Sequence, residues 1–262
     1  MENKEKQSNE SFRQRLYLST TAEDAPALAR DYGLGLEIAE FCTASHMDRA
    51  YAESVKRVDA AMDGVARCTF HAPFNELSPA AIDPLARELA MMRYRQAAVL
   101  AAKYGAKKLV IHTGFIPRVY HPAWFIPESV RFWREFLAGM TEDLALALEN
   151  VMETGPDIPL EIAERVDDPR FRLCLDVGHA NLFAGVTPIE AWIDRCAPLL
   201  THVHLHSNDG AEDLHQCLGE GEPSIGPVLD RLERLCPDVT YAVENGSAAG
   251  SVRWLRTRGY IE

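Results

Sequence analysis

Short runs of β-forming residues alternate with longer amphipathic stretches along the whole 262-residue chain. The predicted strands are Arg15–Ser19, Gly35–Ala39, Cys68–Ala72, Lys108–His112, Ala145–Glu149, Leu173–Asp176, His202–His206 and Thr240–Glu244. Several are nearly continuous apolar runs, such as Leu109–Ile111 and Leu173–Leu175. Such runs are typical of parallel strands that are covered on both faces. The alternation therefore predicts an α/β protein built on a parallel sheet.

The stretches between the strands predict helices at Asp48–Gly64, Asp83–Tyr104, Glu128–Leu144, Pro188–Ala197 and Gly226–Cys236. Repeated strand–helix units without a linker indicate one closed (β/α)8 TIM barrel, a domain that typically has about 250 residues. A doubly wound open sheet with the same alternation is the alternative. We expect residues 13–262 to form the barrel domain and residues 1–12 to be a disordered tail.

Charge and cysteine usage limit the expected partners. The chain has 27 Lys and Arg residues against 39 Asp and Glu residues, which gives a net charge of −12. This negative field repels nucleic-acid phosphates and acidic membrane surfaces, so neither is expected as a partner. The six cysteines are scattered without a CxxC pair, as in the reduced proteins of the cytoplasm. We find no apolar stretch that resembles a signal peptide or a membrane span, and we expect a cytoplasmic protein.

Side chains that bind metals stand at the ends of the predicted strands from the third to the eighth. In chain order they are His71, His112, Glu149, Asp176, His179, His204, His206, Asp213, His215 and Glu244. The carboxyl ends of all strands in a TIM barrel meet at one mouth. We therefore expect these residues, although distant in sequence, to converge on one cavity.

Imidazole nitrogens and carboxylate oxygens are the ligands of Zn²⁺, Mn²⁺, Co²⁺ or Mg²⁺, and the absence of cysteine among them argues against a closed structural zinc site. Glu149 and Glu244 could also face a substrate from two sides and move a proton between faces or neighbouring carbons. Each residue alone has a simpler explanation. A histidine at a strand end can be structural, and Asn150 could cap the next helix. The joint pattern favours a site.

The residues also resemble a known family, the xylose isomerase-like TIM barrels. The similar strings are HAPF (His71–Phe74), VIHTGF (Val110–Phe115), LALEN (Leu146–Asn150), LDVGHANL (Leu175–Leu182), HVHLHSND (His202–Asp209), DLHQCLGEG (Asp213–Gly221) and VEN (Val243–Asn245). The family includes sugar and sugar phosphate isomerases and epimerases, and also apurinic endonucleases of family 2 with three zinc ions. The resemblance extends from about Arg15 to the end of the chain.

The two branches of this family imply different metal sites. The isomerase-like members imply one divalent ion held by Glu149, Asp176, His204 and Glu244, with the two glutamates as acid and base and His179 near the substrate. The endonuclease-like members imply three zinc ions and add further ligands, namely His71, His112, His179, Asp213 and His215. The resemblance therefore implies one to three ions per chain.

The seventh strand is ambiguous because His202, His204 and His206 have the same parity and could all point inward. The following His-Leu pair in the family motif favours His204 as the ligand, with His206 next. We expect His202 to lie deeper in the barrel, as a core histidine.

Acidic loops favour a small substrate over DNA. The predicted loops after the strands are short and carry Glu76, Asp209, Glu212, Glu220 and Glu222 but few basic residues. We therefore expect a metal-dependent isomerase or epimerase of a sugar or sugar phosphate, contacted by His179, His206 and Arg118. A multi-zinc phosphoester hydrolase is the alternative, and a binding barrel without catalysis is a third possibility. The resemblance also implies a homodimer.

Overall fold

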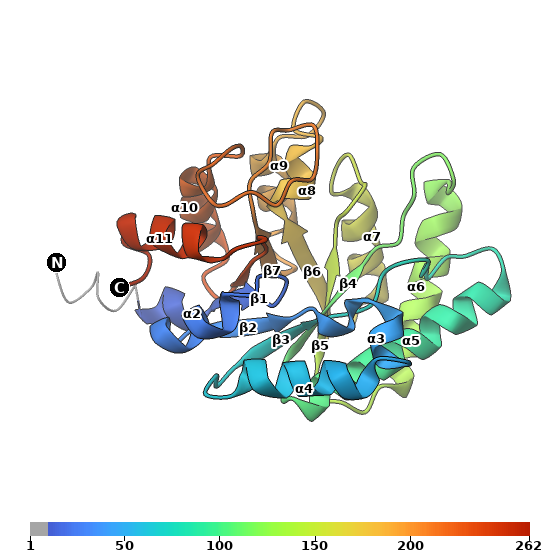
Figure 1. Cartoon of the computed structure of the whole chain (residues 1–262). Helices are drawn as coiled ribbons and strands as arrows, with labels where there is room; N and C mark the ends of the chain where they lie inside the picture. The colour runs from blue at the N-terminus through green and yellow to red at the C-terminus, as the bar shows by residue number, and fades with distance from the viewer. Residues whose placement is uncertain (1–9) are drawn as a thin grey trace.

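The computed structural model describes residues 10–262, and they form a closed barrel of parallel strands in the order β1-β2-β3-β4-β5-β6-β7-β8. β1 closes the ring by pairing with β8, with Leu16 opposite Tyr241 and Leu18 opposite Val243. Figure 1 shows the strands at the centre and the helices around them. The predicted (β/α)8 barrel is confirmed, and the open sheet is wrong because an open sheet would leave β1 and β8 unpaired.

The strands lie close to their predicted positions. Their bounds are β1 Leu16–Ser19, β2 Gly35–Ile38, β3 Cys68–His71, β4 Lys108–His112, β5 Ala145–Glu149, β6 Phe171–Asp176, β7 Leu200–Leu205 and β8 Thr240–Val243. β7 ends at Leu205, so His206 follows the strand instead of closing it. Glu244 likewise comes directly after β8.

The helices were predicted less completely. The helical elements are α2 Ala25–Tyr32, η1 Glu40–Cys42, α3 Ala44–Met47, α4 Tyr51–Met62, α5 Pro84–Lys103, α6 Pro122–Gly139, α7 Asp157–Val166, α8 Val177–Asn181, α9 Ile189–Cys196, α10 Ile225–Leu235 and α11 Ala249–Thr257. α6 begins six residues before the predicted Glu128 because the His121 side chain accepts a hydrogen bond from the Ala123 amide and Pro122 starts the first turn. None of the described helices is both long and apolar enough to cross a bilayer.

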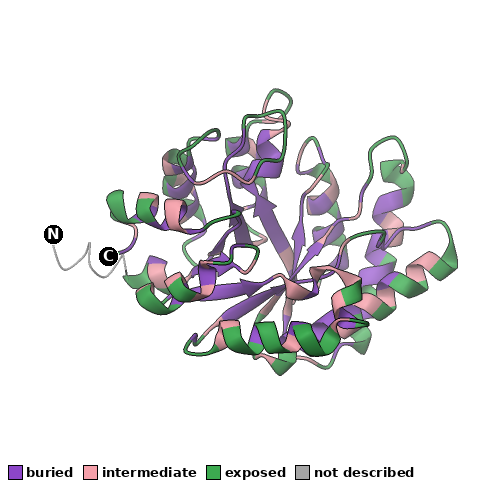
Figure 2. Ribbon diagram, in the orientation of Figure 1, coloured by how far each residue is buried: buried purple, intermediate pink, exposed green. Residues whose placement is uncertain are grey.

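The core has two layers with different chemistry. Apolar side chains such as Val203 and Leu205 point outward from the strands and pack under the helices. Figure 2 shows the strands buried and the outer faces of the helices exposed. Inside the barrel Val110, Ala147 and Cys174 form a small apolar cluster of their own. Polar side chains occupy other inward positions on the strands, and this arrangement brings polar chemistry to one end of the ring.

The predicted tail needs correction in the part that the structure describes. Residues 10–14 are helical, and Phe12 is buried. The Phe12 ring stacks on Tyr241 of β8, with the ring centroids 5.0 Å apart. Burial of this ring gives the segment a reason to be ordered. The rest of the predicted tail, residues 1–9, lies outside the described residues.

We predict that Phe12→Ala destabilises the barrel by about 3 kcal/mol, because it removes a buried aromatic side chain from the contact with β8. The free energy of unfolding in urea measures this loss. Ser11→Ala is the matched control, since Ser11 is exposed on the same segment and its substitution should change stability by no more than about 0.5 kcal/mol. Equal stability of the two variants would mean that the segment does not pack on the barrel.

Candidate metal centre

The strand ends bring the predicted ligands together. His71, His112, Glu149 and Asp176 are the last residues of β3, β4, β5 and β6. The register places His112 opposite Glu149, and Asp176 opposite His204 of β7. Parallel strands of one barrel end at the same mouth. The structure therefore gathers these residues in one place, as expected.

A central group surrounds one nitrogen of His204. Its Nδ1 lies 3.5 Å from Glu149 Oε1, 3.6 Å from Asp176 Oδ2 and 3.5 Å from Glu244 Oε2. His204 is fully buried, and neither ring nitrogen has a well-directed hydrogen bond among the described residues. Three carboxylate oxygens around a buried nitrogen without a hydrogen bond form a donor set that suits a divalent cation. The residues present therefore fit the metal that the sequence implies.

A second group shares Glu149 with the first. His71 Nε2 and His112 Nε2 lie 3.2 Å and 3.4 Å from Glu149 Oε2. The other nitrogen of His71, Nδ1, lies 2.8 Å from the carbonyl oxygen of Ala72. In the neutral ring Nδ1 must then carry the hydrogen, and the lone pair of Nε2 faces the carboxylate. A cation between the two would relieve this contact between a lone pair and an oxygen.

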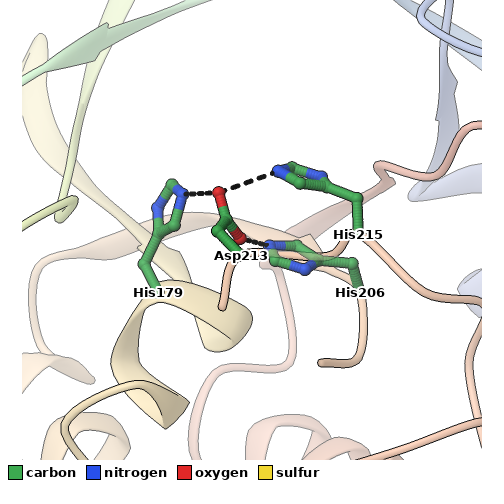
Figure 3. Close-up of side chains that lie close together, drawn as sticks. All are labelled: His179, His206, Asp213 and His215. Atoms are coloured by element: carbon green, nitrogen blue, oxygen red, sulfur yellow. Dashed lines mark hydrogen bonds and ion pairs between the residues drawn. The ribbon is translucent and has the colours of Figure 1, made fainter. Parts of the chain in front are cut away.

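A third group lies beside α8 and on the loop after β7, and Figure 3 shows its four side chains. The Nε2 atoms of His179 and His215 both lie 3.2 Å from Asp213 Oδ2. Each ring directs Nδ1 to a backbone carbonyl, that of Asn150 for His179 and that of Glu244 for His215. This is the same tautomer pattern as at His71, and it leaves two Nε2 lone pairs for a metal.

Loop contacts hold this third group in place. Backbone bridges join Ser207 to Gln216 and Asn208 to Glu222. The Asn245 side chain donates to the carbonyls of His215 and Gln216. Asp213 and His215 therefore reach the centre on a braced loop, and no helix or strand carries them.

Asparagine and backbone contacts also fix the central carboxylate Asp176. Its side chain accepts a hydrogen bond from the His179 amide at 2.7 Å and so caps α8. Its own backbone is held by the Asn150 side chain, which accepts from the Asp176 amide at 2.9 Å and donates to its carbonyl at 3.1 Å. Asn150 thus links β5 to β6, and the suggestion that it caps the following helix is wrong.

The structure separates the three histidines of the seventh strand. His204 belongs to the central group, whereas His206 Nε2 lies 3.0 Å from Asp176 Oδ1 and its ring stacks on His215 at a centroid distance of 4.0 Å. His202 is fully buried and contacts Glu37 and Thr240, which places it in the barrel interior as expected.

One predicted residue stays apart and one important residue was missed. Arg118 is exposed in the loop after β4, with no hydrogen bond or ion pair among residues 10–262, and its role in substrate binding stays a prediction. Glu37 of β2 was overlooked, although it is a fully buried carboxylate between His202 and His204. The signal in the sequence was a single acidic residue at an inward position of the otherwise apolar strand GLEI.

The pKa shifts of the buried carboxylates and histidines agree with a site in which a bound cation replaces protons on the histidines. Burial alone would raise the pKa of Asp176, but the histidines around it hold it well below its usual value. Burial opposes charge on His179 as well, yet nearby carboxylates bring its pKa well above normal. Burial lowers the pKa of His112 to about 3, so this ring is neutral. A divalent ion can replace the protons on such histidines.

Residues 22–257 match the family described as xylose isomerase-like TIM barrel. The chain belongs to this family. Among curated relatives, the uncharacterized protein MJ1311 of Methanocaldococcus jannaschii is 27% identical over 193 residues, which cover 70% of this chain and 66% of that protein. The chain therefore matches slightly less than two thirds of the relative's length.

Solved structures share the fold of the family. A D-tagatose 3-epimerase-like protein has a TM-score of 0.78 at 22% identity, over 94% of this chain and 97% of the other. The TTHB071 protein from Thermus thermophilus, in a structure soaked with ZnCl₂, has a TM-score of 0.69 at 25% identity, over 93% of this chain and 97% of the other. These likenesses support the barrel and make zinc a metal to test.

The metal-free protein should lose the stabilising contribution of His215 in alkaline solution. Burial alone would lower its pKa, but Asp213 raises it to about 9, against about 6.5 in an unfolded chain. The contribution is therefore complete below about pH 6.5 and lost as the pH rises through about 9. The side chains of His215 and Asp213 are 35% and 37% exposed, so solvent screens their attraction. We therefore expect the pair to contribute only about 1 kcal/mol to the free energy of unfolding. Urea unfolding of wild type and His215→Gln at pH 6 and pH 10 measures it, and an equal difference at both pH values would contradict the ion pair.

Proposed function

We propose that this protein is a divalent-metal-dependent isomerase or epimerase that acts on a sugar or sugar phosphate. The observation that carries the proposal is the position of two carboxylates at one nitrogen. Glu149 from β5 and Glu244 after β8 lie at the same distance, 3.5 Å, from His204 Nδ1. Two carboxylates that reach one centre from separate strands suit proton transfer between the faces or neighbouring carbons of a bound substrate.

The central group would hold the ion through Glu149, Asp176, His204 and Glu244. When bound, the ion would polarise a substrate oxygen and make the adjacent C–H bond more acidic. One glutamate would take the proton from that carbon, and the other would return one. Glu149 is 1% exposed and Glu244 8% exposed, so bulk water has little access to either carboxylate. That exclusion protects a carbanion-like substrate from competing protonation.

Residues at the mouth would bind the substrate. His179 is 8% exposed on α8 and could meet a hydroxyl group of a sugar. His206 is fully buried and stacks on His215, so its role in substrate binding stays a prediction. The exposed Arg118 could meet a phosphate. The acidic residues Asp209, Glu212 and Glu222 in the loop after β7 are exposed and would repel an extended nucleic acid. The homodimer and the cytoplasmic location stay predictions.

A second candidate is phosphoester hydrolysis with two or three zinc ions. The third group favours it, because His179, Asp213 and His215 are three closely spaced ligands that a one-metal isomerase does not need. The three groups are also adjacent, since Glu149 lies in a possible metal-binding set with His71 and His112 and in another with Asp176 and His179. Ions held side by side can clamp the oxygens of a phosphate ester.

The first test is metal content by elemental mass spectrometry, combined with exchange of substrate C–H hydrogens in D₂O followed by NMR over a panel of ketoses and their epimers. We expect about one Mn, Co or Mg ion per chain and exchange into at least one sugar. Glu244→Gln should bind less metal and lose the exchange, because it removes both a ligand and a proton carrier. Glu220→Gln, an exposed glutamate of the loop after β7, is the matched control and should match wild type.

Other results would move the conclusion. Two or three zinc ions per chain, with hydrolysis of bis(p-nitrophenyl) phosphate and no C–H exchange, would support the second candidate and contradict the first. Absence of bound metal in wild type, even after reloading, would contradict both.

A further inference from the structure

A chain of polar contacts lies inside the barrel beneath the central group. Glu37 is fully buried there, and its two oxygens are divided between two histidines of β7. Oε1 lies 3.0 Å from His204 Nε2, and Oε2 lies 2.9 Å from His202 Nε2. Thr69 of β3 donates a further hydrogen bond to Oε2 at 2.9 Å. The same ring of His204 thus meets Glu37 on one side and the central group on the other.

In its neutral form the His204 ring carries hydrogen on one nitrogen only, so only the other nitrogen can bind a metal. A neutral imidazole has one N–H group and one lone pair. With the hydrogen on Nε2, the N–H group lies beside the negatively charged Glu37 Oε1, an electrostatic attraction although not a well-directed hydrogen bond, and the Nδ1 lone pair faces Glu149, Asp176 and Glu244. With the hydrogen on Nδ1, the Nε2 lone pair would stand 3.0 Å from a carboxylate oxygen in a dry interior, which is strongly unfavourable. The position of Glu37 therefore selects the tautomer that suits a metal at Nδ1.

Contacts at the other end of the barrel hold Glu37 in turn. His202 Nδ1 lies 2.6 Å from Thr240 Oγ1, and Lys108 Nζ donates to the same oxygen at 2.7 Å. Since Lys108 can only donate, the single hydroxyl hydrogen of Thr240 goes either to His202 Nδ1 at 2.6 Å or to the Thr201 carbonyl at 3.3 Å. The shorter contact favours His202, whose Nε2 then donates to Glu37. The sequence of contacts reaches from the first residues of β4 and β8 to the central group.

Stability alone gives little reason for a carboxylate in this place. An ionised group without water costs several kcal/mol, and an apolar side chain of similar volume is often as stable or more stable. The barrel interior also accepts apolar side chains, as at Val110 and Ala147. A use at the metal centre explains why Glu37 is present.

We infer that Glu37 is a positioning residue of the metal centre, which holds His204 with hydrogen on Nε2 and its Nδ1 lone pair directed at the metal. The inference rests on the proposed function, because it requires a metal at the central group. A carboxylate that orients a ligating histidine and raises its basicity typically contributes about 10- to 100-fold to metal affinity.

The test compares Zn²⁺ affinity, by competition with a chelator, and urea stability of the metal-free protein for wild type and Glu37→Gln. We expect affinity to fall about 10- to 100-fold with no loss of metal-free stability. Glu233→Gln is the matched control, since Glu233 is a partly buried carboxylate paired with Arg15 at 2.6 Å, on α10 outside the three groups. This control should lose stability and keep wild-type affinity.

Nitrogen-15 NMR of the histidines in zinc-loaded wild type gives a second measurement that needs no variant to fold. Zinc on Nδ1 and hydrogen on Nε2 of His204 is the expected state. Zinc on Nε2 would overturn the role of Glu37, as would affinity of Glu37→Gln within twofold of wild type. No binding of zinc, manganese, cobalt or magnesium by wild type would overturn the proposed function as well. Failure of the proposed function is thus distinguishable from failure of Glu37 alone.

Discussion

The mouth of this barrel depends on the attraction between buried carboxylates and histidines. Glu37, Glu149 and Asp176 are almost completely removed from water, and such charges are costly unless they are paired. Imidazoles from neighbouring strands supply the pairing, and His204 alone lies near four carboxylates. Truncation of one partner, unlike its replacement by a neutral side chain of the same shape, would leave its neighbours uncompensated. The polar interior is therefore a single interdependent unit, stabilised from outside by the apolar layer under the helices.

Strand geometry makes this unit possible. Inward and outward side chains alternate along each strand, so β7 can send Val203 and Leu205 into the apolar layer while His202 and His204 enter the barrel. The register then sets the depth at which each polar residue meets its partner. His204 stands opposite Asp176 at the mouth, and His202 stands opposite Thr240 at the other end of β8. One strand thus serves both the metal centre and the contacts beneath it.

Much of this arrangement could be predicted from the sequence because strand periodicity and strand ends are local features. The barrel, the position of each strand and the convergence of His71, Glu149 and Glu244 all depend on them. Glu37 was overlooked although it is an acidic residue in the otherwise apolar strand GLEI, because its partners His202 and His204 lie far along the chain. The braced positions of Asp213 and His215 depend on Asn245 and on bridges to other segments. Phe12 was misjudged because its partner Tyr241 is far along the chain.

The division of the ligands between strands and loop bears on the chemistry. The first two groups belong to the strand ends and to Glu244 directly after β8, so the fold itself builds them. Asp213 and His215 of the third group come from the loop after β7, and loops of a TIM barrel vary more readily than its strands. Proton transfer between carbons needs only the central group, whereas a three-ion hydrolase would need all three groups. The choice between the two activities therefore depends on whether the third group binds an ion beside the ion of the central group. That ion would be bound by the Nε2 atoms of His179 and His215, which are both directed at Asp213.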